Sequence, residues 1–247
     1  RLATSSTTTD WKALKEIEKV QFVGYDHLRV ASNVVKYREV KEKKKTYFQI
    51  VLDDTPFYPE GGGQVGDRGY LQFGEEKISV KDTKRENDLI IHFVDKLPAD
   101  IGHEVIAQVD KTKRILAESN HSATHLLQSA LKDVLGDHIQ QKGSLVNEKL
   151  LRFDFAHFSK LTEEEIRSVE EQVNAKIREN IVLTEKRDLP IQQAKSMGAT
   201  ALFGEKYGEK VRVIAFDSNY SIELCGGTHV KATGEIGYFK ITSEGSV

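Results

Sequence analysis

KTKRILAESNHSATHLLQSALKDVLG, residues 111–136, is the stretch at which the apolar pattern of the chain changes from strand-like to helical. Between Lys113 and Leu135 apolar residues recur at a helical period, at positions 115, 116, 123, 126, 127, 130, 131, 134 and 135. Gly136 then supplies a C-terminal stop. The stretch predicts one long helix, with which a second region of the chain begins.

The residues before this helix predict strands. Short runs rich in β-branched and aromatic residues occur at 28–31, 47–52, 77–80, 89–94 and 104–109, and turn residues separate them. Strands at this spacing are typical of a small barrel or a sandwich over residues 21–110. The first ten residues are rich in Ser and Thr, and apolar residues spaced by three follow over 11–20. We therefore expect a linker and one short helix in residues 1–20.

The residues after the long helix predict a mixed domain. Thr162 and Glu165 form a capping-box pattern that opens a second helix, and Pro190 opens a third, which ends before Gly198. Strand-like runs occur at 150–155, 211–216 and 238–242. We expect an α+β chain in which residues 111–247 form an α+β domain.

Composition excludes several classes of protein. The chain has 247 residues, with 36 Lys and Arg against 38 Asp and Glu, so its net charge is −2. This balance gives no sign of a nucleic-acid coat protein, although a local basic face is compatible with it. No apolar run of about 18 residues and no signal-peptide core occurs, so we expect no membrane segment. The single cysteine, Cys225, excludes an internal disulfide framework and fits the reducing cytoplasm. Because the only methionine is Met197, we interpret the chain as an excised or processed piece.

Two His/Cys pairs carry the strongest chemical signal. His121 and His125 are four residues apart in the predicted helix, so both imidazoles lie on one face. Cys225 and His229 are also four apart, and the glycines between them free the backbone to turn tightly. Three imidazoles and one thiolate are a suitable donor set for Zn²⁺. Two alternatives stay open: the pairs never meet, or Cys225 is a nucleophile activated by a nearby histidine.

Residues 55–64, TPFYPEGGGQ, form a second unusual stretch. Its consecutive glycines expose backbone amides that can approach a phosphate or a ribose. No Walker A sequence follows, and a wide loop between strands explains the stretch equally well. Basic runs occur at Lys41, Lys43, Lys44 and Lys45 and at Lys111, Lys113 and Arg114; they are either solvated faces or contacts for an RNA backbone.

Three of these stretches together resemble the editing region of bacterial alanyl-tRNA synthetases, which is related to free-standing alanyl-tRNA editing proteins. They are NHSATHLL at 120–127, ELCGGTHV at 223–230 and TPFYPEGGGQ at 55–64, with supporting pieces at 141–144, 151–155, 201–206 and 233–237. The resemblance covers the chain from about residue 21. It implies a small β-barrel with a glycine-rich loop over 21–110, followed by an editing domain with a metal site over 111–247. The editing domain of threonyl-tRNA synthetases shares the two metal pairs, but the Cys-Gly-Gly-Thr-His form is similar to the alanyl type.

The resemblance also implies an activity, the hydrolysis of tRNA(Ala) mischarged with serine or glycine. It implies Zn²⁺ on His121, His125, Cys225 and His229, pocket roles for Gln141 and Thr55, and tRNA contacts for Gly61, Gly62 and Gly63. From the basic run we expect further tRNA contacts at Lys113 and Arg114. The implied partners are tRNA(Ala) and the remaining domains of a synthetase, which carry ATP binding, so this chain is not expected to aminoacylate by itself. Two alternatives are a tRNA-binding module with a structural zinc and a free-standing trans-editing protein.

Overall fold

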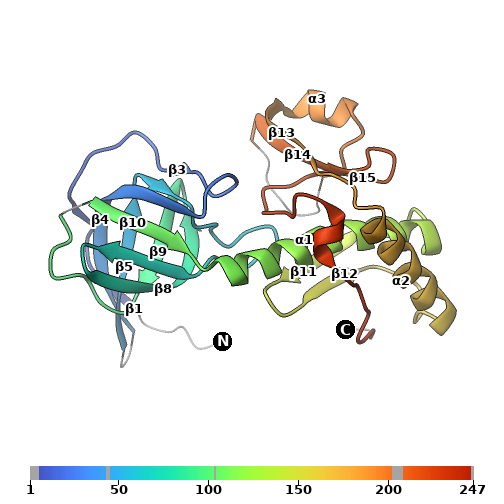
Figure 1. The fold of residues 1–247 in the computed structure, drawn as a ribbon, viewed down its shortest axis with the longest axis horizontal. Helices are drawn as coiled ribbons and strands as arrows, with labels where there is room; N and C mark the ends of the chain where they lie inside the picture. The colour runs from blue at the N-terminus through green and yellow to red at the C-terminus, as the bar shows by residue number, and fades with distance from the viewer. Residues whose placement is uncertain (1–5, 43–44, 103, 202–207, 246–247) are drawn as a thin grey trace. The chain divides into compact units, whose positions relative to one another are not determined.

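The computed structural model describes residues 6–42, 45–102, 104–201 and 208–245, which form two compact units (Figure 1). Unit 1 comprises Arg1–Gly61 and Val65–Arg114, and unit 2 comprises Gly62–Gln64 and Ile115–Val247. The helix α1 (Lys111–Leu135) begins in unit 1 and continues in unit 2. Three residues of the glycine-rich stretch thus belong to the second unit, although the chain on either side of them belongs to the first.

Unit 1 is built around a closed antiparallel β-barrel. Its strands follow one another in the order β4–β10–β7–β8–β9–β5, and pairing of β4 with β5 closes the ring. Closure leaves no unpaired strand edge in the ring, so the barrel expected from the sequence is confirmed and a sandwich is excluded. The six strands are β4 (Arg29–Glu42), β5 (Lys45–Leu52), β7 (Gly69–Phe73), β8 (Glu76–Glu86), β9 (Leu89–Val94) and β10 (Glu104–Val109).

Alternating side chains fill the barrel. In β8, Ile78 and Val80 are buried, while Lys77, Ser79 and Lys81 are exposed, because successive side chains of a strand point to opposite faces. The same alternation in the other strands supplies a core that includes Ile50, Leu52, Leu71, Val94, Val105 and Ala107.

The helix expected within residues 11–20 is wrong. Lys12–Ala13 form the short strand β2, which pairs with β4, and the amides of Leu14 and Lys15 donate to the Val35 carbonyl at 2.8 and 3.1 Å. Trp11, Ile17 and Val20 pack on a cluster at the barrel strands instead of forming a helical stripe. An apolar spacing of three does not distinguish a helix from an irregular segment that covers a sheet. The other short strands of unit 1 are β1 (Ser6–Thr8), β3 (Gln21–Phe22) and β6 (Asp54–Thr55).

Unit 2 packs its helices against two small sheets. The core between α1, α2 and β14 (Lys210–Phe216) includes Leu126, Ala130, Val173, Ile177 and Phe216. A hairpin pairs β11 with β12, β13–β14–β15 form an antiparallel sheet, and α3 contacts β13 and β14. The elements are β11 (Gln141–Val146), β12 (Leu151–Phe155), α2 (Glu163–Arg178), β13 (Thr184–Pro190), α3 (Ile191–Ser196), β14 (Lys210–Phe216), β15 (Ser221–Leu224) and the 3₁₀ helix η1 (Thr233–Ile236).

The helix signals of the sequence are confirmed in unit 2. The hydroxyl of Thr162 accepts from the Glu165 amide, and the Glu165 side chain accepts from the Thr162 amide, which completes the capping box of α2. Pro190 directly precedes α3. Gly136 ends α1 with a φ of 109°, and its amide donates to the Lys132 carbonyl at 2.8 Å. No helix of the described residues is long and apolar enough to cross a membrane.

The strand expected over 238–242 is wrong. The amide of Phe239 donates to Asn174 Oδ1 at 2.9 Å, and the amide of Ile241 donates to Glu170 Oε1 at 2.7 Å. Both acceptors lie on α2, so side chains replace the neighbouring strand that a sheet would need. The apolar residue Phe239 is buried in the core of unit 2.

Candidate metal centre

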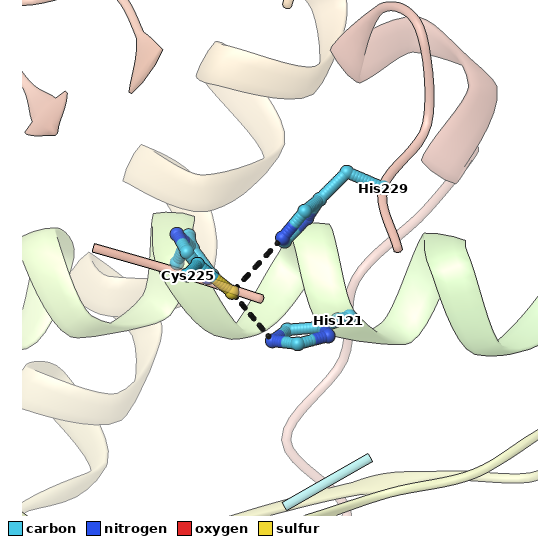
Figure 2. Close-up of side chains that lie close together, drawn as sticks. His121, Cys225 and His229 are labelled. Carbon is cyan, nitrogen blue, oxygen red and sulfur yellow. Dashed lines mark hydrogen bonds between the residues drawn. The ribbon is translucent and has the colours of Figure 1, made fainter. Parts of the chain in front are cut away.

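Four buried donors converge in unit 2. His121 and His125 are one turn apart on α1, Cys225 follows β15, and His229 lies four residues further on. Their ligand atoms all lie within 4.8 Å of one another. Cys225 Sγ is 3.5 Å from His121 Nε2 and 3.3 Å from His229 Nε2, as Figure 2 shows. The two pairs predicted from the sequence therefore meet, and the alternative that they remain apart is wrong.

Neighbouring side chains lie at the second nitrogen of each imidazole and hold two of the three rings by hydrogen bonds. His121 Nδ1 is 2.7 Å from Gln64 Oε1, and His229 Nδ1 is 3.1 Å from Ser122 Oγ. His125 Nδ1 is 3.3 Å from Glu223 Oε2, close but not aligned as a hydrogen bond. In metal sites the nitrogen that does not bind the metal is usually held in this way, which orients the ring. The arrangement turns Nε2 of His121 and of His229 toward the thiol.

Burial favours the uncharged form of these imidazoles. It lowers the pKa of His121 to about 3, with a smaller contribution from the Arg212 guanidinium. Burial likewise lowers the pKa of His125 and of His229 well below the usual value. An imidazole must be deprotonated to bind a metal, so these three side chains are already in the protonation state that binding requires.

Arg212 stabilises the tight turn that carries Cys225 by hydrogen bonds to two of its backbone carbonyls. Arg212 Nη1 donates to the carbonyls of Cys225 at 3.0 Å and of Gly227 at 2.6 Å. A Cβ on Gly227 would collide with the ring of His121, whereas a Cβ on Gly226 would meet nothing within 4 Å. Of the two glycines in this loop, only Gly227 is required by close approach to the candidate ligands.

Gln64 links the glycine-rich stretch to this loop. Its Oε1 accepts from the Thr228 amide at 3.0 Å, and its Nε2 donates to Thr228 Oγ1 at 2.9 Å. The side chain is 1% exposed, so its polar atoms are used inside unit 2. In the sequence, Gln64 is only the last residue of the stretch TPFYPEGGGQ, and no role is predicted for it. Nothing local to that stretch indicates a partner on α1.

The donor set and its surroundings fit Zn²⁺. Three imidazole nitrogens and one thiol are a common set of zinc ligands, and carboxylate, hydroxyl and amide partners beside the rings are typical of zinc sites. A Cys–His nucleophile pair needs one imidazole, whereas three surround this thiol. The four residues can therefore hold a metal ion.

Comparison with known proteins identifies the family. The family described as "tRNA synthetases class II (A)" matches residues 2–113, and "Threonyl and Alanyl tRNA synthetase second additional domain" matches residues 211–247. The alanine–tRNA ligase of Cytophaga hutchinsonii is 60% identical over 245 residues, which are 99% of this chain and 28% of that protein. The alanine–tRNA ligase of Bacteroides thetaiotaomicron is 58% identical over 247 residues, which are 100% of this chain and 28% of that protein. This chain belongs to the alanyl-tRNA synthetase family.

The chain spans less than a third of the length of these alanyl-tRNA synthetase relatives. Cys225 and His229 lie within the match to the second additional domain, whereas His121 and His125 lie between the two matched ranges. The candidate metal centre thus joins residues inside that match to residues outside it.

Gln141 lies in the same unit as the candidate metal centre. It is the first residue of β11, and its Nε2 donates to Ser144 Oγ at 3.1 Å. Gly63 approaches the same strand: its carbonyl accepts from the Val146 amide at 2.7 Å, and a Cβ on it would collide with Ser144. The structure therefore brings Gly62, Gly63 and Gln141 into unit 2, and their pocket and tRNA roles stay predictions.

The other expected site residues belong to unit 1. Thr55 is fully buried, its Oγ1 lies 2.7 Å from His92 Nε2, and it accepts from the Phe57 amide at 3.1 Å. Gly61 and Lys113 also lie in unit 1. The role of Thr55 in the pocket stays a prediction, and its hydroxyl already has partners in the barrel unit. Of the residues quoted from the sequence, Lys43, Lys44 and 202–206 lie outside the described ranges.

Arg114 is buried, contrary to the surface contact expected of it. Its side chain is 1% exposed and forms an ion pair with Asp67. Its Nη1 donates to the Gly24 carbonyl at 2.6 Å, and its Nη2 donates to the Pro56 carbonyl at 2.8 Å. The tRNA contact assigned to Arg114 is therefore corrected to a structural role in unit 1, because its guanidinium offers no surface to an RNA.

Replacing Gly227 by alanine is expected to lower the affinity for Zn²⁺ by about 10- to 100-fold, the range seen when ring-orienting partners are lost. The added methyl group would displace the His121 ring. Gly226→Ala is the matched control and should bind Zn²⁺ like the parent, because its methyl group has free space. Chelator competition measures both affinities, and equal weakening in the two variants would contradict the expectation.

Proposed function

We propose that this chain hydrolyses the ester of tRNA(Ala) mischarged with serine or glycine, and that Zn²⁺ is bound at the four-residue centre. The observation that carries the proposal is the convergence of His121, His125, Cys225 and His229, with Gln141 and the Gly62–Gln64 segment in the same unit. Membership of the alanyl-tRNA synthetase family supports this substrate class.

His121, His125 and His229 would each bind the metal through a ring nitrogen, and Cys225 would bind it through its sulfur. When bound, Zn²⁺ either polarises the ester carbonyl or, with all four protein ligands retained, holds the pocket in shape. Gln64 orients the His121 ring, and Arg212 holds the loop that presents the thiol.

Gln141 is the residue we assign to recognition of the misattached amino acid. Serine differs from alanine by a hydroxyl, which an apolar charging pocket rejects poorly. A carboxamide has both a donor and an acceptor, so it can bind that hydroxyl. Alanine would leave the Gln141 side-chain amide without this partner, which favours hydrolysis of the seryl ester over the alanyl ester.

The partners in this proposal are tRNA(Ala) and the remaining domains of a synthetase, and the location is the cytoplasm. Aminoacylation by this chain alone is not part of the proposal. A second candidate function is a tRNA-binding module with a structural zinc. Four protein ligands around one centre favour it, because catalytic zinc sites usually keep an open position.

Deacylation of Ser-tRNA(Ala) by the 247-residue chain tests the proposal. We expect release of serine at a rate well above that of alanine from Ala-tRNA(Ala), and loss of the activity after chelation. Readdition of Zn²⁺ should restore it. If the folded, zinc-loaded chain binds tRNA but releases no serine, even when the separate aminoacylation domain is added, the second candidate function replaces the first.

A further inference from the structure

An open groove lies on the surface of unit 1. It has a volume of about 630 Å³ and is lined by β7, β8 and the first turn of α1. Its lining includes three cationic side chains, Arg68, Lys81 and Lys113, together with the ring of Tyr70 and the carboxylate of Asp110. None of these residues has been used in the metal centre.

The residues that line the groove carry a net positive charge, because three are cationic and one is a carboxylate. The one lining carboxylate, Asp110, accepts from the Lys113 amide at 3.1 Å and so caps α1. Lys81 pairs with Asp95 at 3.4 Å, and both side chains are more than half exposed. Arg68 and Lys113 form no ion pair with another described residue. The amino end of α1 adds partial positive charge at the same place.

The positive surface continues along the barrel. Tyr70 of β7 is paired in register with Ser79 of β8, and the Lys77 ammonium lies 4.7 Å from the centre of the Tyr70 ring. Lys77, Ser79 and Lys81 alternate with buried residues, so they share the outer face of β8. An aromatic ring among cations on an open strand surface suits an extended polyanion better than a small enclosed anion.

We propose that this groove binds phosphates of an RNA backbone, namely the backbone of the tRNA whose ester the chain hydrolyses. The identity of this RNA rests on the proposed function. A guanidinium donates two parallel hydrogen bonds to a phosphate, and an ammonium adds a mobile charge. Arg68 supplies the first and Lys113 the second. The neighbouring Arg114 is excluded from this role because its guanidinium is buried against Asp67.

The test is equilibrium binding of an uncharged tRNA(Ala) transcript to the 247-residue chain, measured by fluorescence anisotropy over a range of salt concentrations. In the double variant Arg68→Gln and Lys113→Gln we expect affinity to fall by about 10-fold at moderate salt. The slope of log K against log salt should become shallower by about 1.5, since each neutralised phosphate contributes roughly 0.7 to 0.9.

A matched double variant, Lys12→Gln and Lys19→Gln, removes the same charge elsewhere on unit 1. Both side chains are exposed. Lys12 lies in β2, which pairs with β4, and neither residue lines the groove. The affinity of this control variant for tRNA(Ala) should stay within about 2-fold of the parent, with an unchanged salt slope. Equal effects in the two variants, an unaffected groove variant, or a parent chain that binds no tRNA would each overturn the proposal.

Serine release from Ser-tRNA(Ala), measured under single-turnover conditions with the protein in saturating excess over the tRNA, separates this proposal from the proposed function. A parent that releases no serine, combined with weaker tRNA binding by the groove variant, would refute hydrolysis and leave the groove supported. A parent that releases serine, combined with unchanged binding by the groove variant, would refute the groove alone.

Discussion

Replacing Cys225 by alanine is expected to lower the affinity for Zn²⁺ by more than about 100-fold, because loss of a ligand should exceed the 10- to 100-fold cost of losing an orienting partner. The thiol lies within 3.5 Å of Nε2 of both His121 and His229. Without it, the imidazoles form a three-nitrogen set with an open side. Serine release from Ser-tRNA(Ala) should fall together with metal content, which elemental analysis and the deacylation assay measure on the same sample.

Ser129→Ala is the control for this substitution. Ser129 lies on α1, eight residues beyond His121, and its hydroxyl donates to the Tyr220 carbonyl at 2.8 Å. The change removes one hydrogen bond in unit 2, at a cost of about 1 kcal/mol, without touching the metal group. It should retain both Zn²⁺ and activity. Full deacylation by a metal-free Cys225→Ala variant would remove the metal from the mechanism.

Arg114→Met is expected to lower the free energy of unfolding of unit 1 by about 3–5 kcal/mol, the range for breaking a buried ion pair from one side. The substitution leaves the Asp67 carboxylate buried without its counter-charge. It also removes the donors to the Gly24 and Pro56 carbonyls. A buried charge without a partner is costly, so this effect should exceed that of any exposed lysine.

The fluorescence of Trp11 can measure the effect of Arg114→Met on the stability of unit 1. Trp11 is the only tryptophan of the chain and packs on unit 1, where the Arg38 guanidinium lies 4.2 Å from its ring centre. Its fluorescence during denaturant unfolding therefore reports on unit 1. Lys113→Met, one residue away and partly exposed, should change stability by no more than about 0.5 kcal/mol.

A further variant separates the ion pair from its packing. Combining Arg114→Met with Asp67→Leu should recover part of the lost stability, because replacing both members of a buried pair by apolar groups is often tolerated. A double variant no more stable than Arg114→Met would mean that the carbonyl contacts, not the pair, dominate.

The local patterns of the sequence predicted most elements correctly. The helical period between Lys113 and Leu135, the capping box at Thr162 and the alternation in residues 77–80 each depend on neighbours within one or two turns or along one strand. Backbone geometry alone relates such residues, so their faces follow from spacing. The spacing of His121 and His125 is of this kind, and so is that of Cys225 and His229.

Other patterns were misread because the same spacing serves more than one structure. Apolar residues over 11–20 cover the outside of a barrel, and the strand-like run 238–242 donates to side chains of α2. In both segments the backbone hydrogen bonds are made to distant parts of the chain. Their partners decide the conformation, and a local pattern contains no information about them.

The site itself divides in the same way. Residue types and spacing were sufficient to nominate four metal ligands, because three imidazoles and one thiolate form a donor set that suits zinc. Only the tertiary structure shows that Gln64 reaches His121 across 57 residues of sequence, and that Gly227 must lack a side chain. It alone separates Lys113, at a surface groove, from Arg114, buried beside Asp67. Consecutive helical residues point about 100° apart, so burial of one and exposure of the next depend on what packs against the helix.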